Sequence, residues 1–461
     1  MKELIPIHLG LVGHIDHGKT ELARVLSERT STAGLDKHPQ SKKRGITIDL
    51  GFTMFTLGDL LVTLVDAPGH ADLIRSVVAG ANIIDAAILV VAADEGPKVQ
   101  TGEHIVVLQS MGITDVVVAI TKTDLVSENE ASKVQDQVEK IMSTAGFKDV
   151  DVARISTLTG NGVNDLKEIL KKILKPKTRD LVGEFLMPVD HAFPIKGHGT
   201  VITGTVLRGV VSIDDTLELM PQSLPARVRA IQTFGEARSS AEAGARIGMN
   251  MPDIDHLVVS RGNYLAKPGS ISRTSGVVIA VHRNPLYKDR ITKRMIISSM
   301  VGMLNVTAEL IPLNSSGIIV DETKEESFTA ALLLQERIAA EVGMKVLLMR
   351  TDLPPTRMRI VAAGEIVEIP ERILLKRRRL RTGRISRIRT EDVLVEGIAS
   401  SKNIAERMNG LSVMTLSGVK GTLKRPFGTR GVISAIFEDE VRESDEVLFE
   451  RLTEEEYTFG C

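Results

Sequence analysis

The sequence predicts an α/β domain, with a mostly parallel sheet and helices on both of its faces, followed by three β-barrel domains. Short apolar runs such as residues 60–68, 86–93 and 115–122 alternate with helical stretches such as residues 19–28 and 128–146. That alternation is typical of βαβ units. The runs have apolar residues on both faces, as strands covered by helices on both sides should.

The pattern changes after a polar, proline-containing segment at residues 175–180. From there on, β-branched stretches alternate with glycine turns, which is typical of small barrels. We therefore expect the α/β domain over residues 1–179 and the three barrels over residues 180–271, 272–375 and 376–461.

Composition narrows the class of protein. The formal net charge is −1 over 461 residues, so a positive surface must come from local clusters. The single cysteine, Cys461, excludes a disulfide framework or a cysteine zinc site within the chain. There is no signal-peptide pattern at the start, and the longest apolar runs are far too short to span a membrane. We expect a cytoplasmic protein with no membrane partner.

Residues 13–20, GHIDHGKT, lie between an apolar strand and a helix, the setting of a phosphate-binding loop. Gly13 and Gly18 let backbone N–H groups curl around phosphate oxygens, and the helix dipole adds to the attraction. Lys19 can reach the β- and γ-phosphates, and the Thr20 hydroxyl can ligate Mg²⁺. The candidate phosphate-binding residues are Gly13, His14, Ile15, Asp16, His17, Gly18, Lys19 and Thr20, with Gly69 from the next motif.

Two further motifs fit a nucleotide site. DAPGH, residues 66–70, ends an expected strand, so Asp66 can reach a Mg²⁺ shell and the Gly69 N–H can meet a γ-phosphate. RGITID, residues 44–49, lies in the long polar connection after the first helix. A threonine on such a loop, here Thr47, can bind the metal only while a γ-phosphate is present, which makes an order–disorder switch.

TKTD, residues 121–124, predicts recognition of guanine. Asp124 can accept hydrogen bonds from the N1 and 2-amino groups, which adenine cannot supply, and Lys122 can lie along the base. The usual pattern is N-K-x-D, so Thr121 replaces an asparagine and offers fewer hydrogen bonds to the base. The next strand ends in a segment whose backbone N–H would meet guanine O6, which adds as candidates Ser156, Thr157 and Leu158.

These four motifs resemble, in order and spacing, those of the translational GTPases, and the resemblance continues through residues 197–209. It implies an α/β GTPase domain that binds GTP and GDP with Mg²⁺. His70 would position the attacking water, with Ile15 and Ile46 as apolar neighbours that gate it. The implied metal ligands are Thr20, Thr47 and, through water, Asp66. The implied catalytic residues are His70, Lys19 and Thr47.

Three branches of that family come into question. The general aminoacyl-tRNA carrier ends about where Pro370 lies, and the gamma subunit of the archaeal and eukaryotic initiation factor carries a cysteine-rich knuckle that has no counterpart here. Selenocysteine-specific elongation factors of the archaeal and eukaryotic type have a fourth, barrel-like domain, which residues 421–437 resemble. This resemblance implies a GTPase that binds selenocysteinyl-tRNA and delivers it to the ribosome at recoded UGA codons.

Residues 190–193, DHAF, indicate how selenocysteine is recognised. The matching strand of the general carrier resembles EDVF, and a neutral amide stands there where this chain has Arg246. Both differences move one pocket toward positive charge. Because a selenol is largely ionised at neutral pH and a serine hydroxyl is not, we expect Asp190, His191 and Arg246 to line the aminoacyl pocket.

Residues 372–389 hold nine basic residues and no acid. In a nearly neutral chain, such a run favours contact with RNA phosphates, with Arg377, Arg378 and Arg379 as candidates. A solvated linker is the alternative. The partners could further include the selenocysteine-signal mRNA or a protein that binds it.

Overall fold

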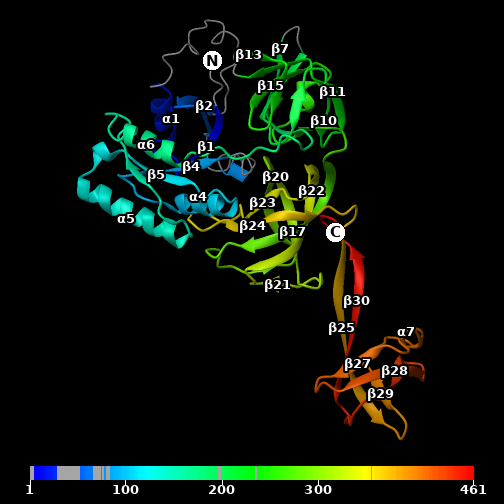
Figure 1. Ribbon diagram of the computed structural model, residues 1–461. Coiled ribbons are helices and arrows are strands. Elements are labelled where there is room, and N and C mark those ends of the chain that lie inside the picture. Colours follow the sequence, from blue (N-terminus) through cyan, green and yellow to red (C-terminus); the bar gives the residue numbers. More distant parts are fainter. Residues whose placement is uncertain are drawn as a thin grey trace. The chain divides into compact units, whose positions relative to one another are not determined.

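The computed structural model describes residues 5–28, 52–65, 74, 77–78, 84–195, 199–233, 236–354 and 356–460. The chain forms two compact units. The first consists of Met1–Pro312, Asp321–Glu371 and Thr458–Cys461, and the second of Leu313–Val320 and Arg372–Tyr457. Figure 1 shows the elements of each unit, coloured along the chain.

The first six strands form one sheet with the order β2-β3-β1-β4-β5-β6. All neighbours are parallel except β2 and β3, which pair antiparallel as a hairpin. The strands are β1 Ile5–Gly13, β2 Phe52–Leu57, β3 Leu60–Val65, β4 Ala86–Ala92, β5 Val116–Thr121 and β6 Val152–Arg154. The loops that follow β1 and β5 therefore lie at the same, carboxyl edge of the sheet, where ligands bind in open parallel sheets.

Helices cover both faces of this sheet: α1 Lys19–Glu28, α4 Val99–Ser110, α5 Glu128–Thr144 and α6 Val163–Ile173. Strand β4 shows why its run is apolar throughout. Leu89 and Val91 enter one buried core with residues of α4 and α5, while Ile88 and Val90 enter another with residues of α1 and α6. The predicted α/β architecture is confirmed.

The next strands form an eight-stranded sheet with the order β11-β10-β16-β7-β8-β15-β12-β13, which surrounds its own apolar core. Strands β9 and β14 pair separately. The elements are β7 Leu186–Ile195, β8 Gly199–Thr205, β9 Val210–Ser212, β10 Thr216–Met220, β11 Leu224–Arg227, β12 Ala230–Thr233, β13 Glu236–Arg238, β14 Ser240–Glu242, β15 Arg246–Met251, the short 3₁₀ helix η2 His256–Val258, and β16 Tyr264–Ala266.

A closed barrel follows, with the order β17-β22-β20-β19-β23-β24. Its strands are β17 Ser272–Arg283, β19 Met295–Val301, β20 Leu304–Leu313, β22 Ser327–Ala340, β23 Lys345–Met349 and β24 Ile360–Glu368, with β18 Ile291–Thr292 and β21 Glu322–Thr323 as a separate pair. Its core includes Ile279, Leu332 and Val346, all almost fully buried.

The second unit contains another closed barrel, with the order β25-β26-β29-β28-β27-β30. The elements are β25 Leu374–Ile388, β26 Val393–Glu396, α7 Lys402–Arg407, β27 Ser412–Thr415, β28 Lys420–Phe427, β29 Val432–Phe437 and β30 Glu446–Glu456. Strands β25 and β30 extend as a long two-stranded ribbon (Figure 1). The basic run 372–389 is thus mostly a strand, and the expected series of β domains after the α/β domain is confirmed. Within the described residues, no helix is both long and apolar enough to cross a membrane.

Candidate functional site

The loop between β1 and α1 curls as its motif predicts. Gly13 has a φ of +148°, and a Cβ there would lie 2.3 Å from the Val90 carbonyl oxygen, so only glycine fits. Asp16 and Gly18 also have positive φ angles, of 64° and 85°. The His17 N–H lies 3.4 Å from the His14 carbonyl oxygen and closes a turn. The backbone therefore forms a concave loop at the start of a helix, a suitable setting for phosphate oxygens.

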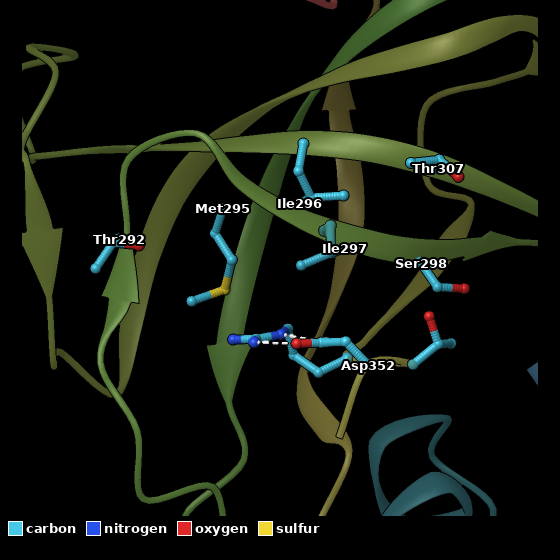
Figure 2. A pocket seen from close by; sticks show the side chains of 9 residues that line it. Thr292, Met295, Ile296, Ile297, Ser298, Thr307 and Asp352 are labelled. Atoms are coloured by element: carbon cyan, nitrogen blue, oxygen red, sulfur yellow. Dashed lines mark hydrogen bonds and ion pairs between the residues drawn. The ribbon is translucent and has the colours of Figure 1, made fainter. Parts of the chain in front are cut away.

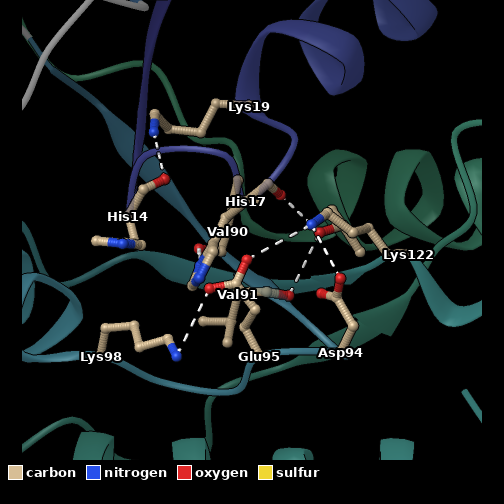
Figure 3. A network of polar contacts seen from close by, with 10 residues as sticks. His14, His17, Lys19, Val90, Val91, Asp94, Glu95, Lys98 and Lys122 are labelled. Atoms are coloured by element: carbon tan, nitrogen blue, oxygen red, sulfur yellow. Dashed lines mark hydrogen bonds and ion pairs between the residues drawn. The ribbon is translucent and has the colours of Figure 1, made fainter. Parts of the chain in front are cut away.

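Lys19 lies against this loop. Its ammonium donates to the carbonyl oxygens of Gly13 at 3.0 Å and His14 at 2.6 Å, and Figure 3 shows the lysine beside His14. Thr20 follows in the first turn of α1 and is exposed. The Lys19 ammonium, the Thr20 hydroxyl and a helix N-terminus thus meet at one place, an arrangement that suits a nucleotide polyphosphate with a hard cation.

His17 lies beneath the loop and is fully buried. Its Nδ1 is 3.4 Å from the Val90 carbonyl oxygen, and its ring meets that of His14 edge to face at 5.0 Å. Burial lowers the pKa of His17 to about 4, because a charged imidazolium would lose its hydration there. The ring is therefore neutral at pH 7, and its role is to support the loop from below.

Helix α4 supports the same loop with residues that the sequence reasoning missed. The Nδ1 of His104 accepts a hydrogen bond from the Gly13 N–H at 2.9 Å, and the Oε1 of Gln100 lies 2.5 Å from Nδ1 of His14. Between them, Glu103 is completely buried. The signal available in the sequence is this group of polar side chains in the first half of α4, directly before its apolar run at residues 105–108.

The two segments that are predicted to bind guanine follow β5 and β6. Asp124 is exposed in the 3₁₀ helix η1 Thr123–Leu125, and the Thr123 N–H donates to the Ile155 carbonyl at 3.3 Å. That contact brings the segment that follows β5 beside the segment that follows β6. The predicted guanine-binding segments are therefore neighbours at one edge of the sheet.

Within the segment after β6, Ser156 is buried and organises a tight turn. Its Oγ accepts from the Thr159 N–H at 3.2 Å, and its carbonyl accepts from the Gly160 N–H at 2.9 Å. Thr157 is half-buried, and Leu158 is 84% exposed at the tip. The turn presents its outer backbone to solvent, where a base could meet it.

Lys122 has a left-handed backbone conformation, with φ 57°. Its ammonium lies 3.1 Å from a carboxylate oxygen of Asp94 and 3.8 Å from one of Glu95, and Lys98 lies 3.6 Å from Glu95. Figure 3 shows this alternation of charges beneath the phosphate loop. Lys122 thus has fixed counter-ions on the loop after β4, which hold its stem along the edge of the sheet.

Several predicted residues lie outside the described part of the chain. They are Thr47 and its neighbour Ile46, and Asp66, Gly69 and His70. The structure does describe the other members of the predicted nucleotide site. They belong to the loops after β1, β5 and β6 and lie at the carboxyl edge of one sheet.

A β-bulge explains how Asp190 and His191 can serve the same site. The pairing of β7 with β8 shifts between Val189, which pairs with Gly204, and His191, which pairs with Thr203. Consecutive strand residues normally point to opposite faces, and a bulge relaxes that alternation. Val189 is buried in the core, while His191 lies half-buried on the other face of the sheet.

Arg246 begins β15 on the same face, because it pairs with Thr205, two residues from the partner of His191. Its guanidinium forms an ion pair with the Asp190 carboxylate, and the two side chains are only 7% and 6% exposed. The structure thus brings the acid and the arginine into direct contact. Of the three predicted pocket residues, Asp190 and Arg246 therefore bind each other directly.

The ribbon divides the basic run between two faces. Directly opposed residues of β25 and β30 share a face, and successive residues alternate. One face therefore carries four arginines and one glutamate, namely Arg377, Arg379, Arg381, Arg451 and Glu455. Over the same stretch, residues 374–381 paired with 449–456, the other face carries two cations and three acids, namely Lys376, Arg378, Glu450, Glu454 and Glu456. We call these the basic face and the mixed face.

Ion pairs within the ribbon follow this division. Arg378 pairs with Glu450 at 2.9 Å on the mixed face, and Arg379 pairs with Glu455 on the basic face. The proposed triplet of Arg377, Arg378 and Arg379 does not form one patch. Arg378 lies on the face opposite to that of its two neighbours and pairs there with Glu450.

The third domain has a hollow of about 500 Å³ on its barrel (Figure 2). Met295, Ile296 and Ile297 form its apolar part, and Arg350 donates from Nε to Asp352 at 2.6 Å. None of the predicted site residues lines it. Because the Arg350 guanidinium is bound by the Asp352 carboxylate, the hollow offers little positive charge to an anion.

Family models match three segments. The elongation factor Tu GTP-binding domain matches residues 6–176, elongation factor Tu domain 2 matches residues 199–266, and domain III of the archaeal selenocysteine-specific elongation factor matches residues 273–370. The selenocysteine-specific elongation factor of Methanocaldococcus jannaschii is 39% identical over 98% of this chain and 98% of its own length. That of Mus musculus is 37% identical over 62% of this chain and 53% of its own.

Solved structures of the same kind of elongation factor are also similar to this chain. Translation elongation factor SelB from Methanococcus maripaludis, in its apo form, has a TM-score of 0.77 and 36% identity, covering 98% of this chain and 99% of its own. The same factor in complex with the GTP analogue GppNHp has a TM-score of 0.76 and 37% identity, with the same coverage. By full-length similarity in sequence and structure, the chain belongs to the selenocysteine-specific elongation factors, a branch of the translational GTPases.

Proposed function

We propose that the protein is a GTP-dependent elongation factor that binds selenocysteinyl-tRNA, delivers it to the ribosome at recoded UGA codons and hydrolyses GTP there. The observation that carries this function is similarity to a selenocysteine-specific elongation factor over 98% of both chains. The phosphate loop of the first domain, with Lys19 against it, supplies the nucleotide chemistry.

GTP and GDP bind through the loop after β1, and the bound Mg²⁺ supplies charge to the phosphates. Thr20, in the first turn of α1, offers a hard oxygen ligand of the kind that Mg²⁺ prefers. Thr47 and, through a water, Asp66 would complete the protein's part of the ion's shell. The Gly69 N–H would bind the γ-phosphate.

For hydrolysis, Lys19 neutralises charge on the β- and γ-phosphates, and His70 positions the attacking water beside Ile15 and Ile46. Phosphoryl transfer depends mainly on such positioning and on electrostatic stabilisation. Asp124 reads the N1 and 2-amino groups of guanine. The backbone of Ser156–Leu158 reads O6, supported by the contact that joins the two segments.

Asp190, His191 and Arg246 form the aminoacyl pocket. This proposal is supported by the register of the strands, which puts His191 on the same face of the sheet as Arg246, and by the ion pair of Arg246 with Asp190. Since Asp190 offsets the charge of Arg246 through one guanidinium nitrogen, the net attraction for a selenolate comes from the His191 imidazole together with the other N–H groups of that guanidinium. Selenocysteine is then favoured over serine because only the former supplies an anion.

The basic face of the ribbon contacts RNA phosphates, either of the tRNA or of the selenocysteine-signal mRNA. An mRNA-binding protein is a further candidate partner. The protein works in the cytoplasm, where its ribosomes are.

A binding assay with purified protein and GTP tests the function. Selenocysteinyl-tRNA is compared with seryl-tRNA on the same tRNA body and with initiator methionyl-tRNA. We expect clear preference for selenocysteinyl-tRNA. Preference for the initiator would instead indicate a function like that of the initiation-factor gamma subunit, and equal binding of all three would indicate a general carrier.

A further inference from the structure

The hydroxyl of Thr121 forms a hydrogen bond to the phosphate loop. Thr121 ends β5 and is 1% exposed. Its Oγ1 donates to the His17 carbonyl at 2.6 Å and lies 3.4 Å from the Val91 carbonyl. A threonine hydroxyl has a single hydrogen to donate, so that hydrogen is used within the protein.

Thr121 also packs against the residue that follows His17 and bonds to the strand beside it. His17 lies directly before Gly18, and a Cβ on Gly18 would lie 3.7 Å from Thr121 Oγ1. The Thr121 carbonyl in turn accepts from the Ala93 N–H at 2.9 Å. Residue 121 is therefore fastened both to the phosphate loop and to the neighbouring strand, and its side chain lies between them.

Guanine presents both donors and acceptors to the segments that follow β5 and β6. Its N1 and 2-amino groups are donors and suit Asp124, while O6 and N7 are acceptors and need donors. In the turn after β6, the N–H groups of Thr159 and Gly160 donate to Ser156. The remaining N–H groups, of Thr157 and Leu158, are candidates for O6. Thr121, at the end of β5, has no second hydrogen with which to donate to N7.

We propose that Thr121 fastens the phosphate loop to the base-binding strand, and that the protein recognises guanine without a hydrogen bond to N7. This inference rests on the proposed guanine site. An asparagine at this position would have two donor hydrogens and one acceptor, enough for both the loop and N7. With threonine the loop contact is kept and the base contact is given up.

The N7 contact is tested by a nucleotide that lacks this acceptor. GTP and 7-deaza-GTP compete with a fluorescent GDP for the full-length protein in the presence of Mg²⁺. We expect the two dissociation constants to agree within about twofold, which is less than the contribution of one hydrogen bond. Binding of 7-deaza-GTP that is tenfold weaker or worse would show that N7 is read, and would overturn the proposal.

Thr121→Val tests the fastening, because valine has the shape of threonine without the hydroxyl. It leaves the buried His17 carbonyl without its donor, so we expect roughly 5- to 100-fold weaker binding of both nucleotides, with their ratio unchanged. Thr121→Ser keeps the hydroxyl and serves as the matched control. Wild-type affinity in Thr121→Val would overturn the fastening role.

Thr121→Asn adds the missing donor. We expect it to introduce a preference for GTP over 7-deaza-GTP of roughly tenfold. If no preference emerges, position 121 is not the residue that determines recognition of N7. Asp124→Asn tests the guanine site separately. If Asp124 does not read the base, this variant should still bind GTP and should not accept xanthosine triphosphate, whatever the ratio of GTP to 7-deaza-GTP affinity.

Discussion

At the scale of single residues, buried polar groups define the candidate sites. His17 supports the phosphate loop in its neutral form, because burial lowers its pKa to about 4. The folded state thus binds fewer protons than the unfolded state, whose histidine titrates near 6.5. The contribution of this residue to stability is complete above pH 6.5 and is lost as the pH falls toward 4.

We therefore expect the unfolding free energy to fall by about 2 kcal/mol between pH 7.5 and pH 5 through His17 alone. Replacing it in His17→Gln should flatten the pH dependence by that amount. Urea unfolding at the two pH values measures it. His282→Gln, at an exposed histidine, is the control and should keep the wild-type slope. Parallel slopes for His17→Gln and wild type would contradict the assignment.

The aminoacyl pocket makes a second prediction at this scale. His191→Ala and Arg246→Ala should each weaken binding of selenocysteinyl-tRNA by about one to two decades, with little effect on seryl-tRNA. Asp190→Asn removes the counter-ion of Arg246, so it should strengthen binding of the anionic aminoacyl group. Binding of both charged tRNAs with GTP present measures the effects. Equal losses for the two tRNAs would place the pocket elsewhere.

Sequence reasoning was strongest where a motif is local. The loop from Gly13 to Thr20 and the segment from Thr121 to Asp124 carry their patterns in consecutive residues, so the sequence predicts at which strand ends they lie, and the structure has them there. The use of Thr121 by the loop was not predictable, because its acceptor, the His17 carbonyl, is 104 residues away. The pairing of Asp190 with Arg246 depends in the same way on the register of β7, β8 and β15.

At the scale of elements, the ribbon shows why a run of charge is an incomplete guide to a surface. Residues 372–389 contain no acid, yet β30 brings glutamates alongside, and alternation separates Arg378 from Arg377. Charge on a strand must be assessed one face at a time, together with the partner strand.

We predict that RNA binding belongs to the basic face. Arg377→Gln with Arg451→Gln should weaken tRNA binding and lower the slope of log affinity against log salt by up to about two units on duplex RNA, and somewhat less on single strands. Lys376→Gln with Arg378→Gln changes the same number of charges on the mixed face and should leave the slope near wild type. Filter binding over a salt series measures both. An equal effect of the two doubles would mean that only total charge matters.

At the scale of the whole molecule, helix α4 joins the phosphate loop to the third domain within the first unit. His104 accepts from the Gly13 N–H, and one residue earlier Glu103 is buried against Arg359, directly before β24. The Arg359 backbone N–H and Nε both donate to Oε1 at 3.1 Å, and its terminal nitrogen donates to Oε2 at 2.8 Å. The apolar core on this face of the sheet also includes Met349 and Ile360 of that domain.

This arrangement predicts that the domain contact influences nucleotide binding. Arg359→Met keeps the backbone N–H contact but removes the guanidinium that offsets the charge of the buried Glu103 carboxylate, which should lower the unfolding free energy by about 3–5 kcal/mol. The displaced helix should also loosen the Gly13 contact and weaken GTP binding roughly fivefold or more, the lower end of typical coupling between sites. Combining it with Glu103→Leu removes the uncompensated charge, so both properties should recover toward wild type. Urea unfolding and GTP titration of the two single variants and the double measure the coupling. If GTP affinity stays at the wild-type value while stability falls, α4 serves only to hold the domains together, and the phosphate loop does not respond to the third domain.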